Sequence, residues 1–494
     1  MSPRQRIGLF LGPALCLLLL LLPVPEGMSP AGMKVAAVTV LMATWWIMES
    51  VPIAATALLP IALFPLLGVM PTAQVTPAYA NHLIYLFMGG FLIAMAIERW
   101  QLHKRIALHT IRIVGTSPRQ VIFGFMFATA FLSSWISNTA TAMMMVTIGM
   151  AVLTQMSGVN PAANEEDRAR TDFGTALMLG IGYSASIGGI ATLIGTPPNA
   201  ILAGVLEKQY GYVIGFTDWM LFGLPVSLVM LLITWLYLTR FAFRAQMNHV
   251  GGSREAIDRE LDALGPMSRQ ERRVLIVFAL VVAAWIGRGF IDAPAFDSLA
   301  DSSIAMIGAL LLFVIPADWK RGEFLLDWKT AARIPWDIIV LFGGGFALAT
   351  GFASSGLTEW LGGQLAVLHD VGLVVTLLAV VLLVIFLTEV TSNTATASLL
   401  LPVMTGFALA TDIHPLFLMV AVALSASFAF MLPVATPPNA IVFSSRQVTI
   451  PQMVRAGIGL NLIATVLIVL AISLYLPLVM DTETPVAPVT APVG

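Results

Sequence analysis

Two short stretches of hydroxyl and amide side chains, embedded in apolar sequence, are the residues of this chain best suited to binding chemistry. Ser-Asn-Thr-Ala-Thr-Ala occurs at residues 137–142, within FLSSWISNTATAMMM, and again at residues 392–397, within FLTEVTSNTATASLL. Ser and Thr in apolar helices ordinarily bond to their own backbone or to a neighbouring helix, so one copy would indicate a structural role. Two copies in matching surroundings predict a paired binding site.

The chemistry available to these motifs is that of neutral oxygen ligands. No charged residue lies between Val121 and Ser157, and Glu389 is the only one between Val371 and Thr411. Hydroxyls, amide oxygens and backbone carbonyls suit a cation of fixed charge such as Na⁺, whereas a proton relay needs titratable groups. An anion bound beside Na⁺ needs no Lys or Arg, because helix ends and Ser, Thr and Asn donors can balance its charge.

Further blocks repeat along the chain and place the motifs in two related halves. LFMGGF at residues 86–91 recurs as LFGGGF at 341–346, an offset of 255 that the Ser-Asn-Thr motifs share. TPPNA at residues 196–200 recurs at 436–440, an offset of 240, and the polar insertion 158–172 accounts for the difference. Each Pro-Pro pair removes amide donors and predicts a broken helix. Broken spans expose helix N-termini to an anion and unwound carbonyls to a cation.

Composition identifies the elements that must position these motifs. Charged residues make up 11% and hydrophobic residues 58% of the 494 residues. We expect an all-α polytopic membrane protein with about eleven transmembrane spans. Residues 1–32 are expected to form a first span; a cleaved signal peptide is the alternative. The net charge of -2, without a long basic run, gives no indication of nucleic-acid binding.

Lys and Arg predict the orientation of the two halves, because cytoplasmic loops carry an excess of both. In the first half they follow the LFMGGF block, from Arg99 to Arg119, and in the second they precede LFGGGF, from Lys320 to Arg333. The repeats are therefore predicted to be inverted in a multi-pass plasma (inner) membrane protein. The N-terminus is expected in the cytoplasm and the C-terminus outside.

The segments that carry the Ser-Asn-Thr motifs are predicted to be re-entrant helical hairpins. Residues 120–157 lie between cytoplasmic flanks and residues 371–410 between external ones, and both segments are too long for one span. Irregular backbone at that depth is tolerated only where protein or a water-filled cavity covers it. We expect the two tips to meet near the middle of the membrane.

Two polar segments lie outside the spans. Residues 253–264 have helical spacing and are expected to form either a solvated linker helix or a helix along the membrane interface. Residues 481–494 are rich in Pro, Thr and Val and are expected to form a disordered external tail. Glu49, Glu98 and Glu359 are expected to be interfacial or paired.

At these motifs the sequence resembles the divalent anion:sodium symporter family, carboxylate transporters related to the mammalian sodium/dicarboxylate and sodium/citrate carriers. The similarity covers residues 33–476, and TWWIMESVPIAATALLPIALFPLLG at residues 44–68 is typical of the early helices of this family. The resemblance implies a homodimer in the lipid bilayer. In each protomer, a transport domain would move like an elevator against a scaffold domain.

The resemblance also implies the ligands of two sodium sites and of the substrate. The first sodium site would consist of Ser133, Ser137, Asn138 and the carbonyl of Gly195. The second would consist of Thr388, Thr391, Asn393 and the carbonyl of Ala435. The residues implied to contact the substrate carboxylates are Ser137, Asn138, Thr139, Thr196, Pro197, Ser392, Asn393, Thr394, Thr436 and Pro437.

The function expected from this resemblance is Na⁺-coupled symport of a C4-dicarboxylate such as succinate, malate or fumarate. A sulfate or tricarboxylate carrier, or a dicarboxylate exchanger, is the alternative on the same fold. An intramembrane enzyme would need a titratable partner, and all six His residues lie outside the motif segments. The expected division is 1–32 first span, 33–119 scaffold, 120–240 transport, 241–273 cytoplasmic linker, 274–370 scaffold, 371–480 transport and 481–494 tail.

Overall fold

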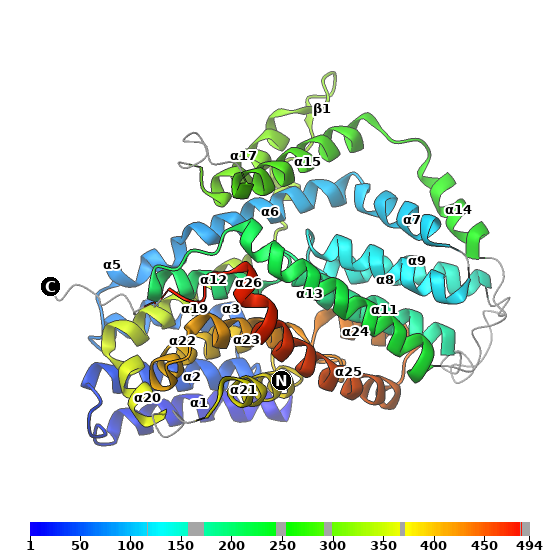
Figure 1. Ribbon diagram of the computed structural model, residues 1–494. Helices are drawn as coiled ribbons and strands as arrows, with labels where there is room; N and C mark the ends of the chain where they lie inside the picture. Colours follow the sequence, from blue (N-terminus) through cyan, green and yellow to red (C-terminus); the bar gives the residue numbers. More distant parts are fainter. Residues whose placement is uncertain are drawn as a thin grey trace.

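The computed structural model describes residues 1–115, 117–156, 172–243, 253–290, 299–365, 371–484 and 486. Residues 158–171 of the polar insertion lie outside the described residues, as does most of the predicted disordered tail. The described chain is almost entirely helical, which confirms the all-α polytopic fold (Figure 1). The exception is a small antiparallel hairpin of β1 (Pro316–Asp318) and β2 (Glu323–Phe324), which the sequence did not predict.

The two halves are built from the same series of elements. Before them lie α1 (Pro3–Leu21), α2 (Pro30–Met48), α3 (Ile53–Ala57), α4 (Leu59–Leu66), α5 (Thr72–Val75) and the 3-10 helix η1 (Thr76–Ala80). The first series is α6 (His82–Arg99), α7 (Leu102–Val114), α8 (Pro118–Ser133), α9 (Asn138–Met156), α11 (Asp172–Gly189), α12 (Pro197–Tyr210) and α13 (Phe216–Leu236). The second is α19 (Trp336–Ser355), α20 (Leu357–Leu365), α21 (Leu373–Thr388), α22 (Asn393–Thr411), α23 (Pro415–Ser427), α24 (Pro437–Ser444) and α25 (Ile450–Leu470).

Other elements join and close these series. The π-helices η2 (Tyr237–Ala242) and η4 (Ala471–Tyr475) follow α13 and α25, and α26 (Leu476–Val479) comes last. The connection between the halves contains α14 (Ser253–Leu264), α15 (Arg269–Phe290), α17 (Asp301–Val314) and α18 (Trp328–Ala331). Eight helices among the described residues are long and apolar enough to cross a membrane, and α1 is one of them.

Both Ser-Asn-Thr segments fold as helical hairpins of matching length. The first hairpin pairs α8 with α9, and the second pairs α21 with α22; each has one helix of 16 residues and one of 19. Figure 1 shows α8 and α9 at the right of the molecule and α22 at the left. The first hairpin packs closely on α11, where a Cβ atom at Gly188 would clash with the carbonyl of Ala130. The hairpins predicted from the sequence are therefore present.

The helix breaks lie a few residues before the positions that the sequence indicated. The unwound residues are 190–196 between α11 and α12 and 428–436 between α23 and α24. Pro197 and Pro437 are the first residues of the helices that follow. Proline is tolerated there, because the first turn of a helix has no intrahelical partner for its N–H groups. The prolines thus start the second half of each broken helix.

The helix α14 packs one face against protein and exposes Glu255, Arg259 and Asp262 on the other, and its position relative to the membrane stays a prediction. Its apolar side chains Ile257 and Leu261 are buried, and the helix lies against α7 and α9. Two ion pairs fasten its polar face to α7, Lys104 with Glu260 at 2.8 Å and Arg112 with Asp258 at 3.1 Å. An amphipathic pattern shows that one face is covered, but it does not identify what covers it.

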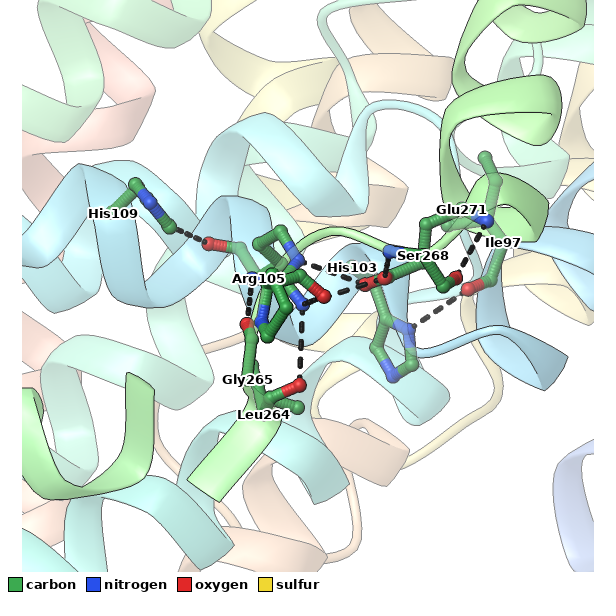
Figure 2. A network of polar contacts seen from close by, with 9 residues as sticks. Ile97, His103, Arg105, His109, Leu264, Gly265, Ser268 and Glu271 are labelled. Carbon is green, nitrogen blue, oxygen red and sulfur yellow. Dashed lines mark hydrogen bonds and ion pairs between the residues drawn. The ribbon is translucent and has the colours of Figure 1, made fainter. Parts of the chain in front are cut away.

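A buried ion pair fixes the turn after α14 to the start of α7 (Figure 2). Arg105 Nε donates to Glu271 Oε1 at 2.8 Å, and the guanidinium also donates to the carbonyls of Leu264, Gly265 and Pro266. Glu271 and Ser268 cap each other's backbone N–H groups. The guanidinium therefore satisfies the free carbonyls at the end of α14 and joins them to α15.

We expect Arg105→Leu to lower the thermal stability of the protein markedly. Removing one partner of a buried pair leaves an uncompensated carboxylate, at a cost of about 3–5 kcal/mol. Arg321→Leu is the matched control, because Arg321 pairs with Asp318 in an exposed setting where a salt bridge contributes about 1 kcal/mol or less. Thermal unfolding in detergent measures both. Equal, small shifts in the two variants would contradict a structural role for the buried pair.

Candidate functional site

A single cavity of about 930 Å³ brings together all ten residues that were predicted to contact the substrate. From the first half these are Ser137, Asn138, Thr139, Thr196 and Pro197, and from the second Ser392, Asn393, Thr394, Thr436 and Pro437. Gly195 and Ala435, predicted to supply carbonyl ligands, also line it. Segments more than 250 residues apart therefore share one space.

Four helix N-termini begin at the wall of this cavity. The helices α9, α22, α12 and α24 start at Asn138, Asn393, Pro197 and Pro437, all of which line it. The first N–H groups of α9 and α22 have no partner within the helix, whereas α12 and α24 begin with Pro-Pro and lack their first two N–H groups. The dipoles of all four helices add partial positive charge. The arrangement offers donors to an anion without a charged side chain at either tip.

Behind the first tip, oxygen atoms converge on the amide of Asn138. Ser133 Oγ lies 2.6 Å from Asn138 Oδ1 and 2.6 Å from the carbonyl of Ala185. The same amide atom lies 3.2 Å from Ala185 O and 3.3 Å from Gly195 O. The Ser133 hydroxyl can donate to an amide oxygen at this place, but the two carbonyls cannot, so the amide is satisfied when it turns and its nitrogen donates to Ala185 O and Gly195 O. The backbone at residue 195 lies so close to the Gly189 carbonyl that a Cβ atom there would clash with it, which explains the glycine.

The second tip repeats part of this arrangement. Thr388 Oγ1 donates to Asn393 Oδ1 at 2.9 Å and lies 3.0 Å from the Ala426 carbonyl. Thr391 is engaged elsewhere, since its hydroxyl lies 2.6 Å from Thr396 Oγ1 and donates to Leu387 O. The structure thus gathers Thr388 and Asn393, whereas a ligand role for Thr391 stays a prediction.

Glu389, the one charged residue of the second hairpin, is used to hold the broken helix. Its carboxylate accepts from the N–H groups of Phe430, Met431 and Leu432 at 2.8, 2.9 and 3.0 Å. Asn461 Nδ2 of α25 donates to it at 2.7 Å. In the first hairpin the matching residue is Ser134, which donates to the carbonyl of Gly188. The sequence showed this carboxylate but not its partners.

Charged side chains outside the two motifs also line the cavity. Glu49, Glu98, Arg333 and Asp337 line it together with His103. Burial lowers the pKa of His103 below its ordinary value, so the imidazole is neutral at pH 7. The sequence predicted interfacial or paired positions for Glu49 and Glu98, and their place in the cavity lining was not predicted. Arg333 belongs to the run of Lys and Arg that the sequence predicts on the cytoplasmic side.

The comparisons with known proteins agree with this geometry. The family model for the sodium:sulfate symporter transmembrane region matches residues 4–481. The chain belongs to this family. A sodium-dependent dicarboxylate transporter SdcS of Staphylococcus saprophyticus is 44% identical over 482 residues, which cover 97% of this chain and 93% of the relative. The SdcS protein of Staphylococcus aureus is 44% identical over 485 residues, covering 98% and 93%.

One solved structure shares the fold at low identity. The YdaH transporter of Alcanivorax borkumensis, described as having an unusual topology, superposes with a TM-score of 0.55 at 14% sequence identity. The match covers 89% of this chain and 98% of the neighbour. At that identity the similarity concerns the fold alone. The resemblance to divalent anion:sodium symporters, inferred from the paired motifs, is confirmed by the family match and the SdcS relatives.

Proposed function

We propose that this protein is a secondary active transporter that couples the entry of Na⁺ to the uptake of a C4-dicarboxylate such as succinate, malate or fumarate. The observation that carries the proposal is the meeting of two Ser-Asn-Thr tips and four helix N-termini around one cavity. SdcS relatives named sodium-dependent dicarboxylate transporters support the same assignment. The neutral lining of the tips favours Na⁺ over H⁺ as the coupling ion.

In this account each tip holds one Na⁺ and offers its outer face to the substrate. The first Na⁺ would be held by Ser133, Ser137, Asn138 and the carbonyl of Gly195; the amide of Asn138 already lies against the Ser133 hydroxyl and the Gly195 carbonyl. The second would be held by Thr388, Thr391, Asn393 and the carbonyl of Ala435, with Thr391 turning from Thr396 towards the ion. The two carboxylates of the substrate would then face one tip each, which matches a dianion to a paired site.

Transport would require the site to move between the two faces of the membrane. We propose an elevator-type movement of the hairpins and broken helices, residues 120–240 and 371–480, against residues 33–119 and 274–370. Inverted repeats are a common basis for alternating access in secondary transporters. We further propose that the protein acts as a homodimer. The scaffold, residues 33–119 and 274–370, would form the contact between the two protomers.

The substrate class is tested by uptake of labelled succinate into K⁺-loaded proteoliposomes, in external medium with or without Na⁺, in the presence of competing anions. We expect malate and fumarate to compete, and sulfate and citrate to compete weakly or not at all. The name of the family includes sulfate, so dominant inhibition by sulfate would identify a sulfate carrier on this fold. Uptake that occurs only with dicarboxylate preloaded inside would indicate an exchanger.

The proposed orientation makes a separate prediction. The cytoplasmic N-terminus, the linker and the external C-terminus follow from the distribution of Lys and Arg. Reporter fusions at Gly252 and Gly494 are expected to give opposite signals, with Gly252 in the cytoplasm. Signals from the same compartment at both positions would contradict the inverted arrangement of the two halves in the plasma membrane.

A further inference from the structure

Two buried asparagines occupy matching positions in the broken helices. Asn199 and Asn439 are each the third residue of a helix that begins at a proline, and both side chains are fully buried. They are the asparagines of the two TPPNA motifs, and the proposed function assigns neither of them a ligand. Their amides are therefore available for another role.

Both amides donate to two carbonyls at matching positions before them, one near the end of the preceding helix and one in the unwound loop. Asn199 Nδ2 lies 3.3 Å from the carbonyl of Gly189 and 2.9 Å from that of Thr192. Asn439 Nδ2 lies 2.9 Å from the carbonyl of Ala429 and 3.1 Å from that of Leu432. In each half the acceptors stand ten and seven residues before the donor. The same bridge is thus built twice.

The nearer acceptor of each bridge also anchors a residue of the proposed sodium sites. The carbonyl of Thr192 accepts from Gly195 N at 3.3 Å, and the carbonyl of Leu432 accepts from Ala435 N at 3.2 Å. Each carbonyl therefore joins an asparagine amide to a tight turn that ends at Gly195 or Ala435. The farther acceptor of each bridge lies where the preceding helix ends, at a depth where an unpaired carbonyl is costly.

We infer that Asn199 and Asn439 are positioning residues that close the two unwound loops and so hold the carbonyls of Gly195 and Ala435 ready for Na⁺. The inference rests on the proposed function. Without the bridges, each loop would have to be ordered by the ion itself, and ordering on binding reduces affinity. A role in filling space alone would not depend on the donor groups.

Sodium binding to the purified protein, without substrate, tests this. A ligand that binds only the folded state raises the unfolding temperature, so a Na⁺ titration in constant ionic strength with K⁺ gives a half-saturating concentration. We expect Asn199→Ala and Asn439→Ala to raise that concentration by about tenfold, the equivalent of one to two hydrogen bonds. Asn199→Ser and Asn439→Ser are close to alanine in volume but keep one donor, and should raise it less.

Thr175→Val is the matched control, because it removes a buried bond of 3.0 Å to the carbonyl of Gln447, outside both unwound loops. It should lower the unfolding temperature without moving the half-saturating Na⁺ concentration. Asparagine variants with wild-type half-saturation, or serine variants that behave like alanine, would overturn the inference. If the alanine variants do not fold, the serine variants are compared with the wild type. A raised half-saturating Na⁺ concentration supports the inference, and a wild-type value overturns it. A wild-type protein that does not respond to Na⁺ would instead overturn the proposed function, and the inference with it.

Discussion

Asn138→Ala and Asn393→Ala are each expected to abolish concentrative uptake while the protein remains folded. Each amide sits where a hairpin turns into its second helix and lies against the hydroxyl of Ser133 or Thr388. A hydrogen bond to a charged group contributes about 1.5–3 kcal/mol, which corresponds to roughly ten- to hundredfold in affinity. Because the binding of cation and anion is coupled, weaker binding of one should weaken the other reciprocally.

Initial rates of labelled succinate uptake over a range of Na⁺ concentrations measure this effect in proteoliposomes. Thr154→Val on α9 is the control, since its hydroxyl bonds only to the preceding turn at Met150 and it does not line the cavity. It should transport like the wild type. A folded Asn138→Ala or Asn393→Ala variant with wild-type affinities for Na⁺ and succinate would show that the corresponding tip does not bind them.

Glu389→Ala is expected to cost more stability than any other single substitution considered for this chain. The buried carboxylate accepts from three backbone N–H groups and from the amide of Asn461. Each buried donor left without a partner costs about 1–3 kcal/mol, and the total stability of a protein is commonly only about 5–15 kcal/mol. We expect the variant to unfold at a much lower temperature or to fail to accumulate in the membrane.

Ser134→Ala provides the comparison, because Ser134 occupies the matching position in the first hairpin and anchors no group of N–H donors. It loses one hydroxyl that donates to the carbonyls of Ala130 and Gly188, so a loss of about 1 kcal/mol is expected. Thermal unfolding of both purified variants measures the difference. Similar unfolding temperatures for the two variants would show that Glu389 does not hold the broken helix.

Repetition explains why so much of the site could be predicted from the sequence. A single Ser-Asn-Thr is ambiguous, but its second copy indicated the two hairpins, and the repeated motifs supplied all ten predicted substrate contacts that line the cavity. The unwound residues lie before the Pro-Pro pairs and not at them, because proline can start a helix as well as end one. A pattern search finds the proline and misses the unwound residues that precede it.

The remaining features depend on contacts between distant segments. Nothing local to Glu389 indicates that three N–H groups around residue 431 converge on it, and nothing in α14 identifies α7 and α9 as its partners. Glu49 and Glu98 were expected at interfacial or paired positions, and nothing near them in the sequence indicates that both line the cavity. Asn199 and Asn439 belong to the two copies of TPPNA, and this repetition was the one sequence feature that could have indicated a shared role.

Accumulation of labelled succinate in proteoliposomes under imposed ion gradients tests the central claim most directly. With Na⁺ outside and K⁺ inside, we predict that succinate rises above its external concentration and that collapsing the Na⁺ gradient releases it. With K⁺ on both sides, an imposed pH gradient should drive no accumulation, because the tips offer neutral oxygen ligands and the carboxylate of Glu389 is held by backbone N–H groups. Accumulation that persists without Na⁺ and follows the pH gradient would contradict the assignment of both tips as sodium sites.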